Sequence, residues 1–160
     1  MQSEPTQEHH WLRRLVGEWT MESSCVMGPG AEPLTSRGTE KVRAVGDLWI
    51  VAEGQGEMPG GGPMTSIMTL GYDPLKKKFV GTWIGSPMAF MFVYEGSMDR
   101  DGKTLPLEAT GPSFTDPTKM TTYRDVITVH DADHRTLTSF APDGAGGWQQ
   151  FMSAVYRRVR

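Results

Sequence analysis

The chain has 160 residues, 22% of them charged, and its formal net charge is -3 at pH 7. Because no excess of lysine and arginine creates a basic surface, we expect neither nucleic acid nor an anionic membrane as a partner. The length suits one domain with a core of its own, and we expect residues 1–160 to form it.

The cysteine content and the N-terminal residues bear on location. Cys25 is the single cysteine, so it cannot form an internal disulfide or a two-thiol redox or zinc site. The first residues include acids and histidines where a secretory signal needs an apolar run, and no segment has the length of an apolar membrane helix. We therefore expect a cytoplasmic protein.

The first predicted element is a helix over residues 6–16. Trp11, Leu12, Leu15 and Val16 gather on one face of this segment, and Gly17 ends it. Residues 1–16 are thus an N-terminal segment with one short amphipathic helix.

The rest of the chain alternates apolar and polar residues between turn signals such as Asp73-Pro74 and Asp101-Gly102, which is typical of antiparallel strands. The predicted strands cover residues 18–27, 35–45, 48–57, 65–72, 78–84, 89–98, 104–110, 120–129, 136–141 and 148–157. Short links between ten strands leave two sheet edges, and closure removes both. We predict an all-β protein, an up-and-down antiparallel β-barrel whose helix plugs one end, with room for one small molecule inside.

Three segments of the chain carry a family resemblance. Residues 9–19 (HHWLRRLVGEW), 38–88 and 111–127 (GPSFTDPTKMTTYRDVI) together resemble the family catalogued as domain of unknown function 1579. The resemblance implies a lipocalin-like, or calycin, barrel without an established activity. Gly17-Glu18-Trp19 is also similar to the glycine-x-tryptophan signature that opens the first strand of lipocalins and nitrobindin-like haem proteins, which implies a structural role for Trp19.

Haem and metal sites find little support. The nitrobindin resemblance would imply an axial histidine on a late strand, but the last predicted strand has none. His130 and His134 flank a turn at residues 131–133, and two imidazoles are too few for a specific zinc site. We therefore expect no cofactor and no metal.

The glycine-rich residues 58–64 lack the lysine of a phosphate-binding loop, and we interpret them as a hairpin loop at the barrel mouth that could act as a lid.

Large and polar side chains within the strands are the candidates for a ligand site. They are Trp49, Glu53, Met68, Trp83, Phe92, Tyr94, Tyr123, Arg124 and Gln150. Alternation means that not all of them point inward, and the sequence leaves open whether Phe92 and Tyr94, or Met91 and Val93, face the interior. Arg124 and Asp125 are adjacent, so at most one is internal.

The favoured function is binding of one small, largely apolar molecule, because aromatic and flexible methionine side chains suit such a pocket. Two other classes remain open. In an isomerase or hydrolase, Glu53 could act as a base with Arg124 as an oxyanion or carboxylate partner. In an interaction protein, the barrel would be filled and its outer face would pair in a homodimer, although a homodimer is compatible with all three classes.

Overall fold

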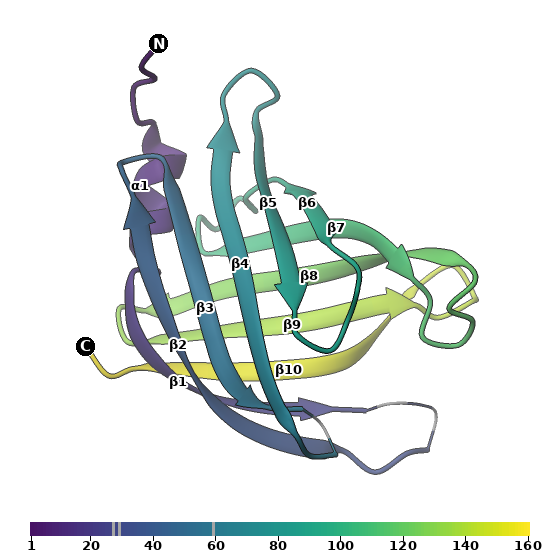
Figure 1. The fold of residues 1–160 in the computed structure, drawn as a ribbon. Helices are drawn as coiled ribbons and strands as arrows, with labels where there is room; N and C mark the ends of the chain where they lie inside the picture. Colours follow the sequence, from purple (N-terminus) through teal and green to yellow (C-terminus); the bar gives the residue numbers. More distant parts are fainter. Residues whose placement is uncertain (27, 29, 59) are drawn as a thin grey trace.

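The structure, a computed structural model, describes residues 1–26, 28, 30–58 and 60–160. Ten antiparallel strands form one closed barrel, in which each strand pairs with its neighbours in the chain and β1 also pairs with β10 (Figure 1). The strands are β1 (Gly17–Cys25), β2 (Leu34–Val45), β3 (Trp49–Glu57), β4 (Pro63–Asp73), β5 (Lys78–Gly85), β6 (Phe92–Gly96), β7 (Thr104–Pro112), β8 (Met120–Asp131), β9 (His134–Pro142) and β10 (Trp148–Arg158). The predicted fold is confirmed.

Closure depends on β1, which pairs on both sides. Trp19 lies opposite Glu40 of β2 and opposite Arg158 of β10. The first and last strands therefore share a ladder, which closes the sheet; the shortest ladder of the barrel joins β6 and β7 at Glu95 and Gly96 of β6.

The helix α1 (Gln7–Arg13) is shorter than predicted and begins after the N-cap residue Thr6. It lies across one end of the barrel (Figure 1). The indole nitrogen of Trp11 donates to the carbonyl of Gly102 at 3.0 Å, in the β6–β7 turn, and His9 Nε2 lies 3.1 Å from the carbonyl of Tyr72, at the end of β4. These contacts hold the helix as the predicted plug.

Trp19 lies directly under this plug and is only 2% exposed. Its indole nitrogen donates to the carbonyl of Leu15 at 2.9 Å, and the guanidinium groups of Arg135 and Arg158 lie 4.6 and 4.3 Å from its ring. Trp19 therefore ties the helix to β9 and β10.

Two predicted strands extend more than one residue beyond the observed strand. The strand predicted at residues 89–98 is confined to β6, and a turn at Ser86-Pro87 precedes it in the connection from β5. The strand predicted at residues 18–27 ends at Cys25, and Met27 lies outside the described residues. In the predicted loop at 58–64, Pro59 also lies outside them, while Pro63 and Met64 already belong to β4.

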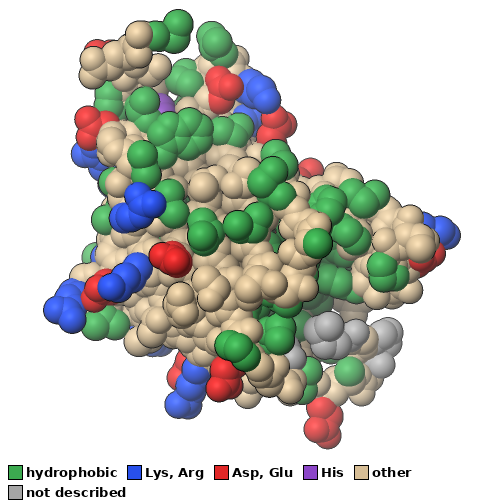
Figure 2. Space-filling view, viewed as in Figure 1, with side chains coloured by type: hydrophobic (Ala, Val, Ile, Leu, Met, Phe, Trp, Pro, Cys, Tyr) green, Lys and Arg blue, Asp and Glu red, His purple; other side chains and the backbone are tan. Residues whose placement is uncertain are grey.

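The outer surface carries charges of both signs. On the face in Figure 2, acidic and basic side chains lie near one another around the periphery, and neither sign forms a continuous patch. None of the helices in the described part of the chain is both long enough and apolar enough to span a membrane.

Candidate ligand cavity

Three hollows lie inside the barrel, and Trp83 and Leu137 line all of them. We call them the helix-end hollow, of about 60 Å³, the Cys25 hollow, of about 230 Å³, and the Asp125 hollow, of about 190 Å³. Because the three share lining side chains, a change in the Trp83 side chain alters the shape of all of them.

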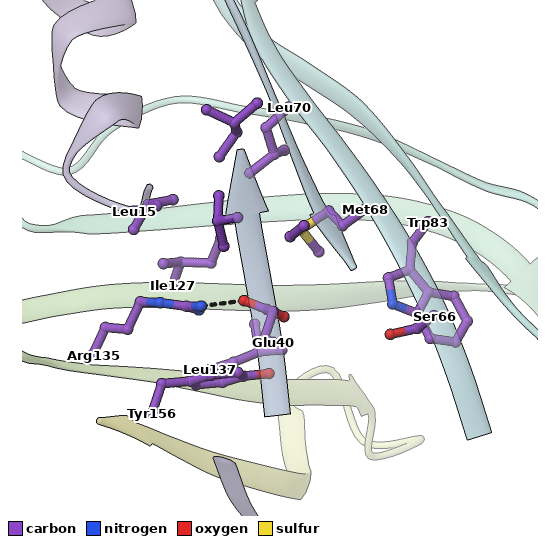
Figure 3. A pocket seen from close by; sticks show the side chains of 13 residues that line it. Leu15, Glu40, Ser66, Met68, Leu70, Trp83, Ile127, Arg135, Leu137 and Tyr156 are labelled. Atoms are coloured by element: carbon purple, nitrogen blue, oxygen red, sulfur yellow. Dashed lines mark hydrogen bonds and ion pairs between the residues drawn. The ribbon is translucent and has the colours of Figure 1, made fainter. Parts of the chain in front are cut away.

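The helix-end hollow contains a buried ion pair. Arg135 of β9 donates to Glu40 of β2, and both side chains are nearly inaccessible to solvent (Figure 3). The guanidinium also lies 3.9 Å from the centre of the Tyr156 ring, and its Nε atom has no hydrogen-bond partner among the described residues. Burial, followed by the nearby Glu40 charge, raises the pKa of the Tyr156 hydroxyl, so Tyr156 stays neutral.

The Cys25 hollow lies between β1, β2, β3 and β10. Its wall mixes methionines with small polar groups, and the hydroxyls of Ser23 and Ser36 are 2.5 Å apart. Burial raises the pKa of the Cys25 thiol, which keeps the sulfur protonated at neutral pH. Two acids also line this hollow, Glu40, which is paired with Arg135, and Glu57, which is exposed to solvent.

Aromatic rings form most of the wall of the Asp125 hollow. The ring centre of Tyr123 lies 6.0 Å from that of Phe92, 5.1 Å from that of Phe114 and 6.0 Å from that of Phe151. Trp83 continues the wall, with its ring centre 5.9 Å from that of Phe92. The Tyr123 hydroxyl donates to the carbonyl of Pro112 at 2.6 Å, so it is already satisfied.

One acid interrupts this aromatic wall. The Asp125 carboxylate accepts hydrogen bonds from the hydroxyls of Tyr94 on β6 and Ser139 on β9, the latter at 2.6 Å. Burial raises the pKa of Asp125, while the two hydrogen bonds oppose that rise. The pKa of Tyr94 lies well above its usual value, first because the phenol is buried and then because Asp125 is close.

A β-bulge in β10 adds to the wall. Gln150 pairs with Phe140 of β9 and Met152 pairs with Ser139, so Phe151 is an extra residue in the ladder. Phe151 and Met152 consequently both line the Asp125 hollow, although they are adjacent in the chain.

The Asp125 hollow opens to solvent at the barrel end away from α1. Two of its lining residues are partly exposed: Met88, in the β5–β6 connection, is 38% exposed and Phe114, in the β7–β8 connection, is 55% exposed. The opening therefore has an apolar rim.

Five of the nine side chains predicted for a ligand site line the hollows: Met68, Trp83, Phe92, Tyr94 and Tyr123. The other four lie elsewhere. Trp49 is 45% exposed and packs over Gly71, where an added Cβ would lie 2.3 Å from its ring. Glu53 and Gln150 are exposed.

Arg124 projects from the outer face of the barrel. It forms an ion pair with Glu108 of β7 at 2.7 Å, and its guanidinium lies 4.3 Å from the centre of the Trp148 ring. Glu53 lies on a different strand and is also exposed, so the two side chains do not face one cavity as a base and its partner.

The sequence interpretation missed Glu40, Arg135 and Ser139 as interior residues; it left open whether Arg124 or Asp125 faces inward and included only Arg124 among the site candidates. A signal for Asp125 existed in the alternation of β8, where Tyr123, Asp125, Ile127 and Val129 share one face. Three of these four residues are apolar or aromatic, so the alternation indicates that this face of β8 points into the barrel. Ser139 and Glu40 have no comparable signal.

The late histidines lie at the opposite end of the barrel from the Asp125 hollow's rim. The rings of His130 and His134 stack at 4.7 Å across the β8–β9 turn, and His130 Nε2 is 3.0 Å from the Thr136 hydroxyl. Within residues 1–26, 28, 30–58 and 60–160, no three His, Cys, Asp or Glu side chains are grouped so that they could hold a metal ion.

The sequence matches a family model over residues 4–158, and that family is described as a protein of unknown function, DUF1579. The chain belongs to this family. No curated protein matches the chain at a significant level. Membership of the DUF1579 family therefore shows which proteins this chain is related to but does not indicate an activity.

Solved structures share the architecture of this DUF1579 protein at low sequence identity. Rv2717c from M. tuberculosis superposes with a TM-score of 0.69 at 15% identity, covering 98% of this chain and 100% of that chain. The S-type phycobiliprotein lyase CPES from Guillardia theta gives 0.67 at 16% identity, covering 98% and 99%. EF1p2_mFAP2b bound to DFHBI gives 0.51 at 14% identity, covering 95% and 99%. These likenesses show the fold.

Proposed function

We propose that this barrel binds one small, largely apolar molecule in the Cys25 and Asp125 hollows. The observation that carries the proposal is their apolar lining: aromatic rings and methionines surround internal space of about 230 and 190 Å³. Small-molecule sites are typically concave and apolar with a few polar groups that set orientation. The Tyr94, Asp125 and Ser139 group is such a polar point on the wall.

The construction of the barrel supports the proposal. A barrel meant only as a scaffold would gain stability by filling its interior, since empty space costs contact energy. Here two of the residues that line the Cys25 hollow are glycines of β3, Gly54 and Gly56, which put no side chain into it. One of the solved structures with a similar fold also supports small-molecule binding, because the barrel EF1p2_mFAP2b was solved with DFHBI bound.

Cavity-filling variants test the proposal. Ala109 lines the Asp125 hollow and is 4% exposed, whereas its neighbour Thr110 is exposed on the outer face of β7. The neutral fluorophore N-phenyl-1-naphthylamine reports apolar sites by an increase in emission. We expect wild type to bind it and Ala109→Leu to weaken binding by about tenfold or more, equivalent to about 1.4 kcal/mol.

Thr110→Leu is the matched control, because it adds apolar atoms to the same strand but outside the barrel. It should bind the fluorophore as wild type does. If Ala109→Leu is too unstable to study, Ala154→Leu fills the Cys25 hollow instead. Unchanged binding in both filled variants, with folded protein by circular dichroism, would place the fluorophore on the outer surface and sink the proposal.

A further inference from the structure

The charged side chains that line the three hollows are unequal in sign. They are three acids, Glu40, Glu57 and Asp125, and one base, Arg135. Arg135 is already bound to Glu40, and its guanidinium also lies against the rings of Trp19 and Tyr156. The interior therefore has more acids than bases, and among the described lining residues the one base, Arg135, is already paired.

Asp125 is the buried acid without a cationic partner. Within the described part of the chain, no ion pair involves Asp125, and its two hydrogen-bond donors are the neutral hydroxyls of Tyr94 and Ser139. Glu57 differs because it is exposed to solvent. A carboxylate enclosed by protein without a counter-charge is unfavourable, and a cation supplied from outside would remove that cost.

The walls around Asp125 suit a cation as well. Phe92, Phe114, Tyr123 and Phe151 line the same hollow, and aromatic ring faces attract organic cations through the negative charge of their π systems. A ligand with an ammonium group and an apolar body would satisfy the carboxylate and the rings together.

We infer that the Asp125 hollow binds a small protonated amine with an apolar body, its ammonium directed to the Asp125 carboxylate and its body held against the aromatic wall. This inference rests on the proposed binding function and specifies the ligand class. The ammonium enters beside two oxygens that each already accept one hydrogen bond and keep a second lone pair free.

Two other ligand chemistries fit less well. An organic carboxylate in this hollow would meet the like charge of Asp125. Arg135, the one cation among the described residues that line the hollows, lies at the helix-end hollow of about 60 Å³, which has space for water but not for an apolar body. A neutral alcohol would fit the space but would leave Asp125 without a counter-charge.

Isothermal titration calorimetry with three probes of similar shape tests the inference. The probes are 2-phenylethylamine, 2-phenylethanol and 3-phenylpropionate, each titrated at pH 7 into wild type, Asp125→Asn and Asp99→Asn. Asp99 is the matched control because it is an exposed aspartate in the β6–β7 connection, and Asp99→Asn changes the net charge equally. We expect wild type to bind the amine at least about tenfold more tightly than the alcohol, and the carboxylate least.

The variants separate the local charge from the net charge. Asp125→Asn should weaken amine binding by about tenfold or more and leave alcohol binding within about twofold, whereas Asp99→Asn should change neither. Equal affinities for amine and alcohol, or an unchanged amine affinity in Asp125→Asn, would overturn the inference. If the neutral fluorophore still binds in that case, the proposed function stands; if neither it nor any probe binds, both fall.

A pH titration of wild type gives a second measurement that needs no variant. Amine binding should weaken as the pH falls and Asp125 takes up a proton, while alcohol binding stays constant. The other titratable side chains that line the hollow, Tyr94 and Tyr123, have pKa values raised above 10 and do not titrate in that range. Parallel pH profiles for amine and alcohol would contradict the inference.

Discussion

Asp125 of β8 lies directly opposite Ser139 of β9, and the serine hydroxyl donates to the Asp125 carboxylate at 2.6 Å. Both side chains point into the barrel because they occupy the same face of adjacent strands. Ser139 is only 3% exposed, so bulk water does not reach this position to donate a hydrogen bond in place of the serine hydroxyl. The pair is thus a fixed part of the cavity wall.

Removing this hydroxyl should destabilise the protein. We expect Ser139→Ala to lower the free energy of unfolding by about 1–3 kcal/mol, because a buried carboxylate oxygen loses its partner. Urea unfolding at pH 7 measures the change. Ser153→Ala on β10 is the control, since the Ser153 hydroxyl has no hydrogen bond with any described residue, and its change should stay within about 0.5 kcal/mol. Equal losses in both variants would contradict this prediction.

The raised pKa of Asp125 predicts how stability depends on pH. Because the folded-state pKa lies above the ordinary value of 3.8, the folded protein holds the proton more tightly than the unfolded chain. Asp125 therefore contributes stability below pH 3.8, and that contribution is lost as the pH rises through the folded-state pKa.

Asp125→Asn removes this titration and supplies the measurement. Unfolding free energies of wild type and variant, compared from pH 3 to neutral pH, should diverge, with wild type losing stability relative to the variant as the pH rises. A difference that stays constant with pH would show that Asp125 titrates alike in the folded and unfolded chains.

Removing one partner of the buried Glu40 and Arg135 pair should lower the free energy of unfolding much more than removing one partner of a surface pair. Glu40→Gln leaves the Arg135 guanidinium buried without its counter-charge, and we expect a loss of about 3–5 kcal/mol. Glu108→Gln, which breaks the surface pair with Arg124, should cost less than about 1 kcal/mol. The double change Glu40→Leu with Arg135→Met should recover much of the loss; no recovery would mean that the charges themselves are required.

The plug formed by α1 depends on Trp11. Trp11→Phe keeps the edge-on packing against Phe79, whose ring centre is 6.0 Å away, but loses the hydrogen bond to Gly102, and we expect a cost of about 1 kcal/mol. Trp11→Ala should cost about 3–5 kcal/mol, because it also empties the space under the helix. Thermal unfolding distinguishes the two, and similar melting temperatures would show that the ring contributes little beyond its hydrogen bond.

The arrangement of the strands was readable from local patterns. Alternation places Tyr123 and Asp125 on one face and Arg124 on the other whatever the rest of the chain does, since successive residues of a strand point to opposite sides. Turn sequences such as Asp101-Gly102 likewise act over a few residues. Sequence alone thus predicted the number of strands, their antiparallel order and the helix that covers one end.

The sequence by itself determined the strands, their hairpin order and the two faces of each strand, because these follow from interactions between residues close together in the chain. Closure was predicted from the two free edges that ten hairpin-linked strands would otherwise leave. Only the tertiary structure decided which face is inside and which side chains meet there. Tyr94 and Asp125 are 31 residues apart, and their hydrogen bond depends on the register of the intervening strands. The bulge at Phe151 likewise shifts the register between β9 and β10 and brings Phe151 to the Asp125 hollow. Such long-range alignment is set by the packing of the whole barrel, and no local pattern contains it.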